Sequence, residues 1–459
     1  MALRVVAATL FSPRGGSAQV MRALVEGLRA QGCSVTLVAG SRSDLGADGD
    51  AGSFYGEDVH AVSFDVALAS ATPLRFEGPP GSAPMHPSFE ERPEAPDRVF
   101  AALDDLEYEH QVRVWGRELQ RAGAADADVL YLHHLTPLNE AAARVAPLVP
   151  VVGHLHGTEL LMLERIAAGA PASWRYAEQW AARMCMWAQR CARIVVAPAG
   201  VERALSLLGV VRNRMVVLPN GVQLELFRRR SLDRRAFWRC VLVQRPRGWL
   251  PGQGPGSARY HEREADRLAA GVVLLYVGRF TAVKRLDRLL AAFGRARERA
   301  SSPVGLVLVG GHPGEWEVEH PAQLAERLEI PSVFLAGWYP HEELPSFFSA
   351  ADAVVLSSER EQFGQALIEG MACGLPAVAV RSLGPGEIVE DGRTGWLVDG
   401  DDKDALAQAL TEVVDDARER ERRGRAALRS VRERFTYPGV VARLRAVLEE
   451  VAAHASLRA

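Results

Sequence analysis

Short apolar runs alternate with amphipathic stretches along most of the chain. Mostly apolar residues occupy positions 5–9 and 35–39, and between them Val20, Leu24 and Leu28 recur with the period of a helix. A strand, a helix and a second strand in this order predict a parallel sheet with helices packed against it. Further strands are predicted at 129–133, 151–155, 194–197, 215–218, 272–277, 306–309, 333–335, 353–356 and 376–380. The predicted fold class is therefore α/β.

Two segments interrupt this alternation. From 44 to 96 no period persists and Gly, Pro, Ser and Asp are frequent. We therefore expect an irregular loop that forms a lid over a binding site or one of its walls. After Arg228, Arg, Pro and Gly are frequent, so we expect a linker with an insertion. The predicted organisation is a first domain at 1–225, the linker and insertion at 226–270, a second domain at 271–434 and an amphipathic terminal helix at 435–459.

Composition agrees with a chain of two domains in a reducing compartment. The 459 residues exceed what one hydrophobic core usually serves, and 48% hydrophobic with 24% charged residues is ordinary for a globular protein. The net charge of -3 gives no reason to expect nucleic acid as a partner. The five cysteines fit neither a zinc site nor a disulfide framework, and apolar runs stay shorter than the ~20 residues of a membrane span. We expect a cytoplasmic protein, either monomeric or homodimeric.

One predicted helix carries three tryptophans. Trp174, Trp180 and Trp187 lie, with several arginines, between residues 173 and 193. Tryptophans at such spacing are usually core residues, and the arginines then form a solvated face. An aromatic and basic face that contacts a membrane surface stays an alternative.

The strongest candidate for chemistry lies between residues 350 and 381. A predicted strand is followed by a polar loop, a helix opened by Phe363-Gly364 and a second strand. Glu361 lies in the loop, and Glu369 lies eight positions later inside the helix. Because a helix N-terminus favours anions, this element offers an anion site beside two carboxylates. A nucleotide sugar presents a matching set, which is a diphosphate, sugar hydroxyls and ribose hydroxyls.

This stretch closely resembles the signature of the family 4 retaining glycosyltransferases, which have the GT-B architecture. The resemblance rests on Glu361-x7-Glu369, with Phe363-Gly364 between the glutamates and Gly374-Leu375-Pro376 after them. It covers most of the chain from Gly15 to Val398 and includes Pro219-Asn220-Gly221-Val222, where Gln223 replaces the usual Asp, and Gly384-Pro385-Gly386-Glu387. It implies two Rossmann-like, doubly wound domains that face each other across a cleft. A C-terminal helix would cross back onto the first domain.

A cationic pair in the second predicted domain extends the resemblance. Arg279 follows a predicted strand and Lys284 comes five residues later, and a guanidinium with an ammonium suits a diphosphate. The family commonly has glycine after the lysine, where this chain has Arg285. The resemblance implies that Glu361 holds the donor sugar and Glu369 the ribose. The donor-binding residues that it implies are Gly16, Arg279, Lys284, Glu361, Phe363, Gly364, Gln365 and Glu369.

The acceptor side is predicted in the first domain. Gly15-Gly16 closes the first strand-to-helix turn, and His156 follows a later strand, where parallel sheets bind ligands. In the family a histidine at this place faces the donor sugar and the acceptor, whereas a strand-end histidine bonded to backbone is the alternative. The implied acceptor-side residues are Gly15, Gly16, His133, Asn139, His156 and Thr158. The spacing of His133, His134 and His154 matches no metal-ligand pattern, so no metal site is expected.

The resemblance implies a retaining, metal-independent glycosyltransferase. Such an enzyme would move a hexose-type sugar from a nucleoside-diphosphate sugar, with UDP-sugars favoured, to a hydroxyl of a small-molecule or glycan acceptor. No cofactor is expected, and the implied catalytic residues are His156, Arg279, Lys284 and Glu361. Two alternatives stay open. One is a GT-B sugar-nucleotide epimerase, and the other is a non-catalytic nucleotide-sugar-binding protein.

Overall fold

The chain folds as two compact units, each built around a parallel sheet. The computed structural model describes residues 2–456 except 14, 57, 92–96, 314–315, 401 and 403. The first unit consists of Met1–Asn220 together with Tyr437–Ala459, and the second consists of Gly221–Thr436. Both units have the doubly wound arrangement that the alternation of strands and helices predicts.

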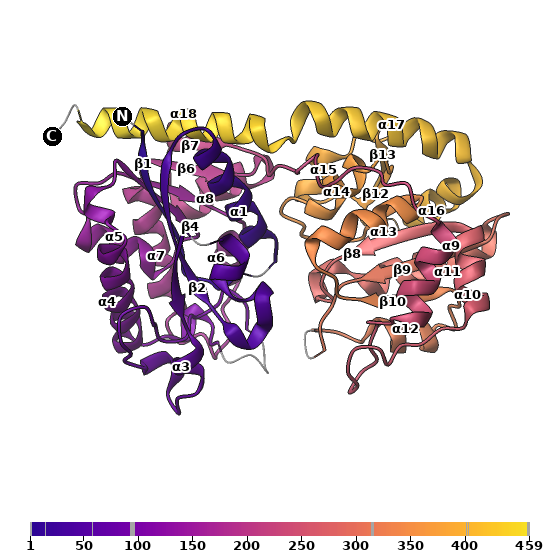
Figure 1. The fold of residues 1–459 in the computed structure, drawn as a ribbon, viewed down its shortest axis with the longest axis horizontal. Helices are drawn as coiled ribbons and strands as arrows, with labels where there is room; N and C mark the ends of the chain where they lie inside the picture. Colours follow the sequence, from indigo (N-terminus) through magenta and orange to yellow (C-terminus); the bar gives the residue numbers. More distant parts are fainter. Residues whose placement is uncertain are drawn as a thin grey trace. The chain divides into compact units, whose positions relative to one another are not determined.

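Within the described residues, seven parallel strands form the sheet of the first unit (Figure 1). Their order in space is β3-β2-β1-β4-β5-β6-β7. The strands are β1 (Arg4–Thr9), β2 (Ser34–Ser41), β3 (Val59–Ser63), β4 (Val129–His133), β5 (Val151–His154), β6 (Arg193–Val196) and β7 (Met215–Val217). Because β1 and β4 are neighbours in the middle, the chain winds outward from the centre in both directions.

Alternate residues of the central strands face two separate cores. In β1, Val5 and Ala7 belong to one apolar cluster and Val6 and Ala8 to the other, as the period of two in a strand requires. Helices α1 (Gly15–Ala30) and α18 (Tyr437–Ser456) cover the first face. The second face is covered by α4 (Asp105–Arg121), α5 (Pro137–Val145), α6 (Thr158–Ala167), α7 (Ala177–Arg190) and α8 (Val201–Leu208).

The crossing of the C-terminal helix onto the first unit is confirmed. Helix α18 packs against α1, and its Leu444 and Leu448 are fully buried (Figure 1). The approach is close, since a Cβ on Gly27 of α1 would lie 2.5 Å from Cγ2 of Val441. Glycine at this position therefore lets the two helices pack closely.

The irregular loop predicted at 44–96 is corrected by the structure. Strand β3 joins the edge of the sheet, and two short helices, α2 (Ala51–Tyr55) and α3 (Asp65–Leu68), flank it. Phe64 and Met85 are fully buried in the core of the unit. Residues 57 and 92–96 of this segment lie outside the described residues. Strand β3 lies at the edge of the sheet and only Val62 of its five residues is buried, so no apolar run marks it in the sequence.

The three tryptophans of the α7 region are core residues. Trp180 and Trp187 lie in α7 and are almost fully buried, and Trp174 is 5% exposed. The Trp180 ring stacks on Phe100 at a centroid distance of 4.7 Å. The aromatic face that motivated the membrane alternative is therefore turned inward. Among the described residues, none of the helices combines the length and the apolarity that a membrane crossing requires.

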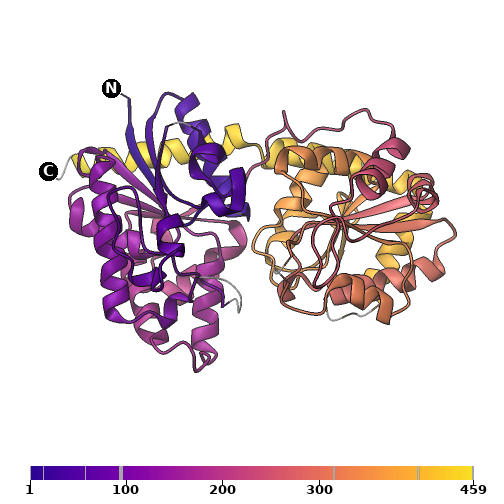
Figure 2. The same cartoon turned by 60° about the horizontal axis from the view of Figure 1, so that its bottom comes forward.

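In the part of the second unit that the structure describes, six parallel strands form the sheet, in the order β10-β9-β8-β11-β12-β13. They are β8 (Val272–Val277), β9 (Val304–Val309), β10 (Val333–Gly337), β11 (Ala353–Leu356), β12 (Ala377–Val380) and β13 (Gly395–Val398). Helices lie on both sides of this sheet (Figure 2). They are α9 (Arg234–Arg239), α10 (Glu262–Ala270), α11 (Leu286–Arg299), α12 (Pro321–Arg327), α13 (Leu344–Ala350), α14 (Gln365–Ala372), α15 (Leu383–Ile388), α16 (Ala405–Asp415) and α17 (Ala417–Arg434).

The segment 226–270 folds as part of the second unit, which differs from the predicted linker with an insertion. Trp238 and Trp249 of this segment are buried, and the Trp249 indole N–H donates to the carbonyl of Gly311 at 3.1 Å. The same stretch lies against β10, because a Cβ on Gly248 would be 2.0 Å from the carbonyl oxygen of Leu335. The arginines and glycines that suggested a linker flank these buried tryptophans in the sequence.

Candidate functional site

In the second unit, three charged residues predicted to act together lie at the carboxyl edge of the sheet. Arg279 follows β8, Lys284 ends a short turn of 3-10 helix at Ala282–Lys284, and Glu361 lies in the loop after β11. The Lys284 ammonium and a Glu361 carboxylate oxygen are 2.5 Å apart, although 77 positions separate them in the chain. Strands β8 and β11 are neighbours, which explains how the two loops meet.

Several contacts fix the Lys284–Glu361 pair in place. The Ser357 hydroxyl donates to the carbonyl of Lys284 at 2.8 Å, and the Glu359 N–H donates to the carbonyl of Val283 at 3.0 Å. The paired side chains are largely shielded, with 20% of Lys284 and 15% of Glu361 exposed. Burial raises the pKa of Glu361, but the charges of Lys284 and Arg279 outweigh it and hold the pKa below its usual value. The carboxylate is thus ionised and paired.

The turn that carries Arg279 is packed through glycines. The Tyr276 hydroxyl donates to the carbonyl of Arg279 at 2.7 Å. Gly310, which follows β9, has a φ of 119°, and a Cβ there would lie 2.3 Å from the carbonyl oxygen of Gly278. The backbones after β8 and β9 therefore approach each other closely. The Arg279 side chain beside this contact is exposed to solvent.

Arg285 shows why related chains have glycine at this position. Its φ of 49° and ψ of 50° are left-handed, a conformation that glycine adopts without steric cost. Here the arginine is held by its ion pairs with Asp287 at 2.9 Å and with Glu359 at 3.0 Å. Arg285 thus holds a left-handed backbone conformation that is strained for a residue with a side chain.

Helix α14 begins where the sequence predicted. Gly364, with a φ of 104°, precedes its first residue Gln365. The amide of Gln365 donates to the carbonyl of Gly221 at 3.0 Å, and the ring of Phe363 is buried against Phe435 at 5.9 Å. Gly384 donates its N–H to the carbonyl of Glu361 at 2.8 Å. The Phe363 and Gln365 side chains thus brace the loop, and donor contact by them stays a prediction.

Glu369 has a partner that the sequence did not indicate. Its carboxylate is 2.8 Å from Nε2 of His341, and Glu369 is only 3% exposed. The His341 ring packs on Phe227 at a centroid distance of 4.8 Å. One carboxylate oxygen of Glu369 is therefore held by the protein. No spacing rule links these residues, because they lie 28 positions apart on different elements.

The glycine turn of the first unit is open. Gly15 has a φ of 71° and starts α1, and both Gly15 and Gly16 are exposed. A Cβ added at Gly16 would meet no heavy atom of the described residues within 4 Å. Packing inside the protein therefore does not require glycine at position 16, and the space above it is accessible to a ligand.

Histidines gather at the carboxyl ends of β4 and β5. His133 and His154 are paired in register at the ends of these strands, and His156 follows two residues later. Nδ1 of His133 and Nε2 of His156 are 2.9 Å apart, so His156 pairs with a side chain here. This finding corrects the alternative of a backbone-bonded histidine. Ligand atoms of all three lie within 4.8 Å of one another, a grouping that their spacing along the chain does not reveal. The sequence did carry one indication of this cluster, because two successive predicted strands both end near a histidine.

The remaining acceptor-side residues have mixed roles. The Asn139 amide donates to the carbonyls of His134 at 3.1 Å and Thr136 at 3.2 Å, which is a structural role. Thr158 is the first residue of α6, and the buried carboxylate of Glu159 beside it pairs with Nδ1 of His134 at 2.7 Å. Glu159 was not among the predicted site residues.

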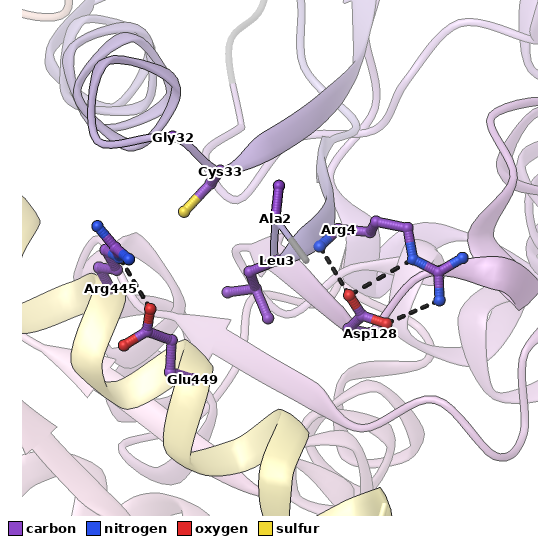
Figure 3. Close-up of a pocket in the computed structure, with 8 residues that line it drawn as sticks. All are labelled: Ala2, Leu3, Arg4, Gly32, Cys33, Asp128, Arg445 and Glu449. Carbon is purple, nitrogen blue, oxygen red and sulfur yellow. Dashed lines mark hydrogen bonds and ion pairs between the residues drawn. The ribbon is translucent and has the colours of Figure 1, made fainter.

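A cavity of about 470 Å³ lies at the opposite edge of the first sheet, near the start of β1 (Figure 3). Its charged side chains are already paired, Arg4 with Asp128 at 2.8 Å and Arg445 with Glu449 at 2.8 Å. Parallel sheets bind ligands at the carboxyl ends of their strands, so this cavity lies at the wrong edge for binding a nucleotide sugar or its acceptor.

Two family models match most of the chain. The model described as Glycosyltransferase Family 4 matches residues 14–226, and the model described as Glycosyl transferases group 1 matches residues 263–430. The second match includes the predicted donor residues Arg279, Lys284, Glu361 and Glu369.

Curated relatives named D-inositol 3-phosphate glycosyltransferase match part of the chain. The protein of Corynebacterium diphtheriae is 34% identical over 206 residues, which cover 43% of this chain and 48% of the relative. The protein of Thermomonospora curvata is 32% identical over 247 residues, 52% of this chain and 53% of the relative. The chain thus spans about half the length of the curated relatives that it matches.

Solved structures share the fold over nearly the whole chain. Sucrose-phosphate synthase from Thermosynechococcus elongatus superposes with a TM-score of 0.69 at 18% identity, covering 98% of this chain and 100% of its own. HepE from Anabaena, solved in complex with UDP and glucose, gives a TM-score of 0.67 at 16% identity, covering 97% and 99%. At such identities the likeness shows the fold, and the two-domain GT-B fold is confirmed.

Proposed function

Since this chain belongs to the family 4 glycosyltransferases, we propose that it transfers a hexose-type sugar from a nucleoside-diphosphate sugar to an acceptor hydroxyl, with retention of configuration. The observation that carries this proposal is the meeting of Arg279, Lys284 and Glu361 at one edge of the second sheet. Two cations with an ionised carboxylate between them suit a diphosphate joined to a sugar.

The proposed chemistry is the exchange of one glycosidic bond for another. The bond from the anomeric carbon to the diphosphate oxygen breaks, and a bond from that carbon to the acceptor oxygen forms. The proton of the acceptor hydroxyl passes to the departing diphosphate, which leaves on the same face. Arg279 and Lys284 stabilise the negative charge that develops on the diphosphate, and fixed charges of this kind are usually the largest catalytic contribution.

The carboxylates and the histidine have separate proposed tasks. Glu361 binds hydroxyls of the transferred sugar, and the free carboxylate oxygen of Glu369 binds the ribose, because His341 already holds the other one. His156 serves the acceptor side, together with the open glycine turn at Gly16. No metal ion is required in this scheme, since cationic side chains stabilise the leaving group.

UDP is the proposed donor nucleotide. HepE, which shares the fold, was solved with UDP, and the curated relatives carry names of glycosyltransferases that act on an inositol phosphate. The acceptor is therefore proposed to be a polyhydroxylated small molecule or a glycan. All five cysteines, each among the described residues, are unpaired thiols, which supports a cytoplasmic location.

Binding of nucleotides in the presence of excess EDTA tests the function. We expect UDP to raise the free energy of unfolding by about 2.7 kcal/mol at 100 times its dissociation constant, and GDP, ADP and dTDP to do so less. Thermal unfolding measures this effect. Transfer of sugar from a UDP-sugar to a panel of polyols and glycans should proceed equally well with EDTA present.

Other outcomes would contradict the proposal in distinct ways. Stabilisation by none of the four nucleotides would exclude a donor site for them in the second unit. Interconversion of the donor sugar without an acceptor would indicate an epimerase, and binding without any turnover would indicate a binding protein. A loss of activity in EDTA that manganese or magnesium restores would reveal a required metal.

Gly16→Ala should separate catalysis from stability. Its new methyl group enters open space and a helix prefers Ala to Gly, so the free energy of unfolding should stay equal or rise by about 0.5–1 kcal/mol. Turnover should fall at least roughly tenfold, because the methyl group occupies space where the donor or acceptor must lie. Steady-state kinetics and chemical denaturation measure the two effects.

Gly254→Ala is the matched control. A Cβ at Gly254 also meets no heavy atom of the described residues within 4 Å, but this glycine lies outside the predicted site. Its substitution should leave turnover unchanged, and the free energy of unfolding should stay equal or rise slightly, as for Gly16→Ala. Wild-type turnover in Gly16→Ala would place the ligand away from the glycine turn.

A further inference from the structure

The histidine cluster of the first unit has features that the proposed transfer reaction does not use. His133 and His154 end neighbouring strands in register, and His156 follows β5. The ring centroids of His133 and His154 lie 4.9 Å apart, and those of His154 and His156 lie 4.5 Å apart. Three imidazoles are thus held within one small volume at the edge of the sheet.

One nitrogen in this cluster is buried without a partner. His133 is 1% exposed, its Nδ1 is taken by His156, and its Nε2 has no hydrogen-bond partner among the described residues. Leaving a buried polar atom unpaired costs about 1–3 kcal/mol, so such an atom in a native protein calls for an explanation. A ligand that accepts the lone pair of Nε2 would remove this cost.

Outer contacts supply the orientation and the charge that a dication needs. The Tyr131 oxygen lies 2.5 Å from Nδ1 of His154 and can accept its N–H, which leaves Nε2 as a ligand. Glu159 is fully buried, and its carboxylate lies 2.7 Å from Nδ1 of His134. The backbone N–H of His156 donates to the same carboxylate at 3.2 Å. Hydrogen bonds from a ligand histidine to neighbouring protein groups are typical of metal sites.

We infer that His133, His154 and His156 form a binding site for one divalent transition-metal ion of the zinc class. Tetrahedral zinc with ligand distances of 2.0–2.1 Å needs nitrogens about 3.4 Å apart, and the cluster already holds them within 4.8 Å. To close the difference, the half-buried His156 side chain has to give up its 2.9 Å contact with Nδ1 of His133. The fourth position stays open to water. Imidazole ligands select zinc, cobalt or nickel over magnesium.

Occupation of this site and sugar transfer should exclude each other. This consequence rests on the proposed function, in which His156 serves the acceptor side. A metal ion bound to His156 withdraws it from that role, so zinc should inhibit turnover and EDTA should restore it. Metal binding itself is measured without donor or acceptor, so its failure can be told apart from failure of the proposed function.

Titration of the metal-free protein with Co²⁺, followed by calorimetry and by the visible absorption of the ion, tests the inference. We expect one Co²⁺ per chain with the absorption of a four-coordinate site, and no binding of Mg²⁺. Loss of an outer contact alone costs 10–100-fold in metal affinity, so His133→Gln and His156→Gln should each cost at least about 100-fold. Tyr131→Phe should lower the affinity for Co²⁺ roughly 10–100-fold, and because it leaves Nδ1 of His154 buried without this contact it should also lower the stability of the metal-free protein.

His60→Gln is the matched control, because His60 pairs with Glu118 elsewhere in the same unit. It should bind Co²⁺ like the wild type. His156 is only half-buried, so its variant should fold even if His133→Gln does not. The inference is overturned if the wild-type protein takes up no Co²⁺ at a single site. It is equally overturned if His156→Gln binds within threefold of wild type, or if His60→Gln loses as much affinity.

Discussion

Lys284→Ala should lower turnover about 100-fold or more while the protein keeps its fold. Losing one fixed stabiliser of a developing charge typically costs 10²–10³ in turnover. Lys284 is placed for this role at the edge of the sheet, anchored by Ser357 and 2.5 Å from Glu361. Steady-state kinetics with a saturating sugar nucleotide measures the effect, and thermal unfolding checks the fold.

Arg295→Ala provides the comparison, since Arg295 lies in the same unit and forms an exposed ion pair with Asp404 at 2.9 Å. An exposed pair contributes little, so this variant should turn over like the wild type. Turnover of Lys284→Ala within a factor of three of wild type would remove Lys284 from the leaving-group site.

Glu361→Gln should separate nucleotide binding from catalysis. In the structure Glu361 neutralises Lys284, so a diphosphate must compete with a carboxylate for the ammonium. The amide releases Lys284, and free UDP should then bind roughly threefold to fivefold more tightly, equivalent to about 0.7–1 kcal/mol. Turnover should still fall about 100-fold, because the sugar loses its carboxylate. Calorimetric titration with UDP and steady-state kinetics measure the two effects.

Glu369→Ala should change the affinity for free UDP in the opposite direction. The ribose is present in UDP and in the donor, so both should bind more weakly by about 1.5–3 kcal/mol. His341, which loses its contact with Glu369, stays packed on Phe227. Equal weakening of UDP binding by the Glu361 and Glu369 variants would show that Glu361 does not face the sugar.

Much of the fold and the meeting of the charged residues in the candidate site could be predicted from the sequence, because both depend on where strands end. Lys284 and Glu361 lie far apart in the chain, yet each follows a strand of one parallel sheet. The sequence alone predicts no effect of losing Glu361 on nucleotide affinity. The ion pair with Lys284 changes that expectation, and pairing between side chains of separate loops leaves no periodic signal.

The features that the sequence analysis missed or judged wrongly also have physical explanations. Strand β3 lies at the edge of the sheet with only Val62 buried, so no apolar run marks it in the sequence. Arg285 adopts a left-handed backbone that its identity argues against, and two ion pairs explain why it does so. The histidines were judged by spacing along the chain, whereas the register of β4 with β5 is what brings His133 and His154 together.

The chain passes between the two units twice, after Asn220 and after Thr436, and the N–H of Val222 donates to the carbonyl of Phe435 at 2.8 Å beside these crossings. In connectivity, the second unit is an insertion within the first. During synthesis the second unit is complete before α18 emerges, whereas α1 must wait for α18 before the two helices can pack. The unit that is made first therefore finishes folding last.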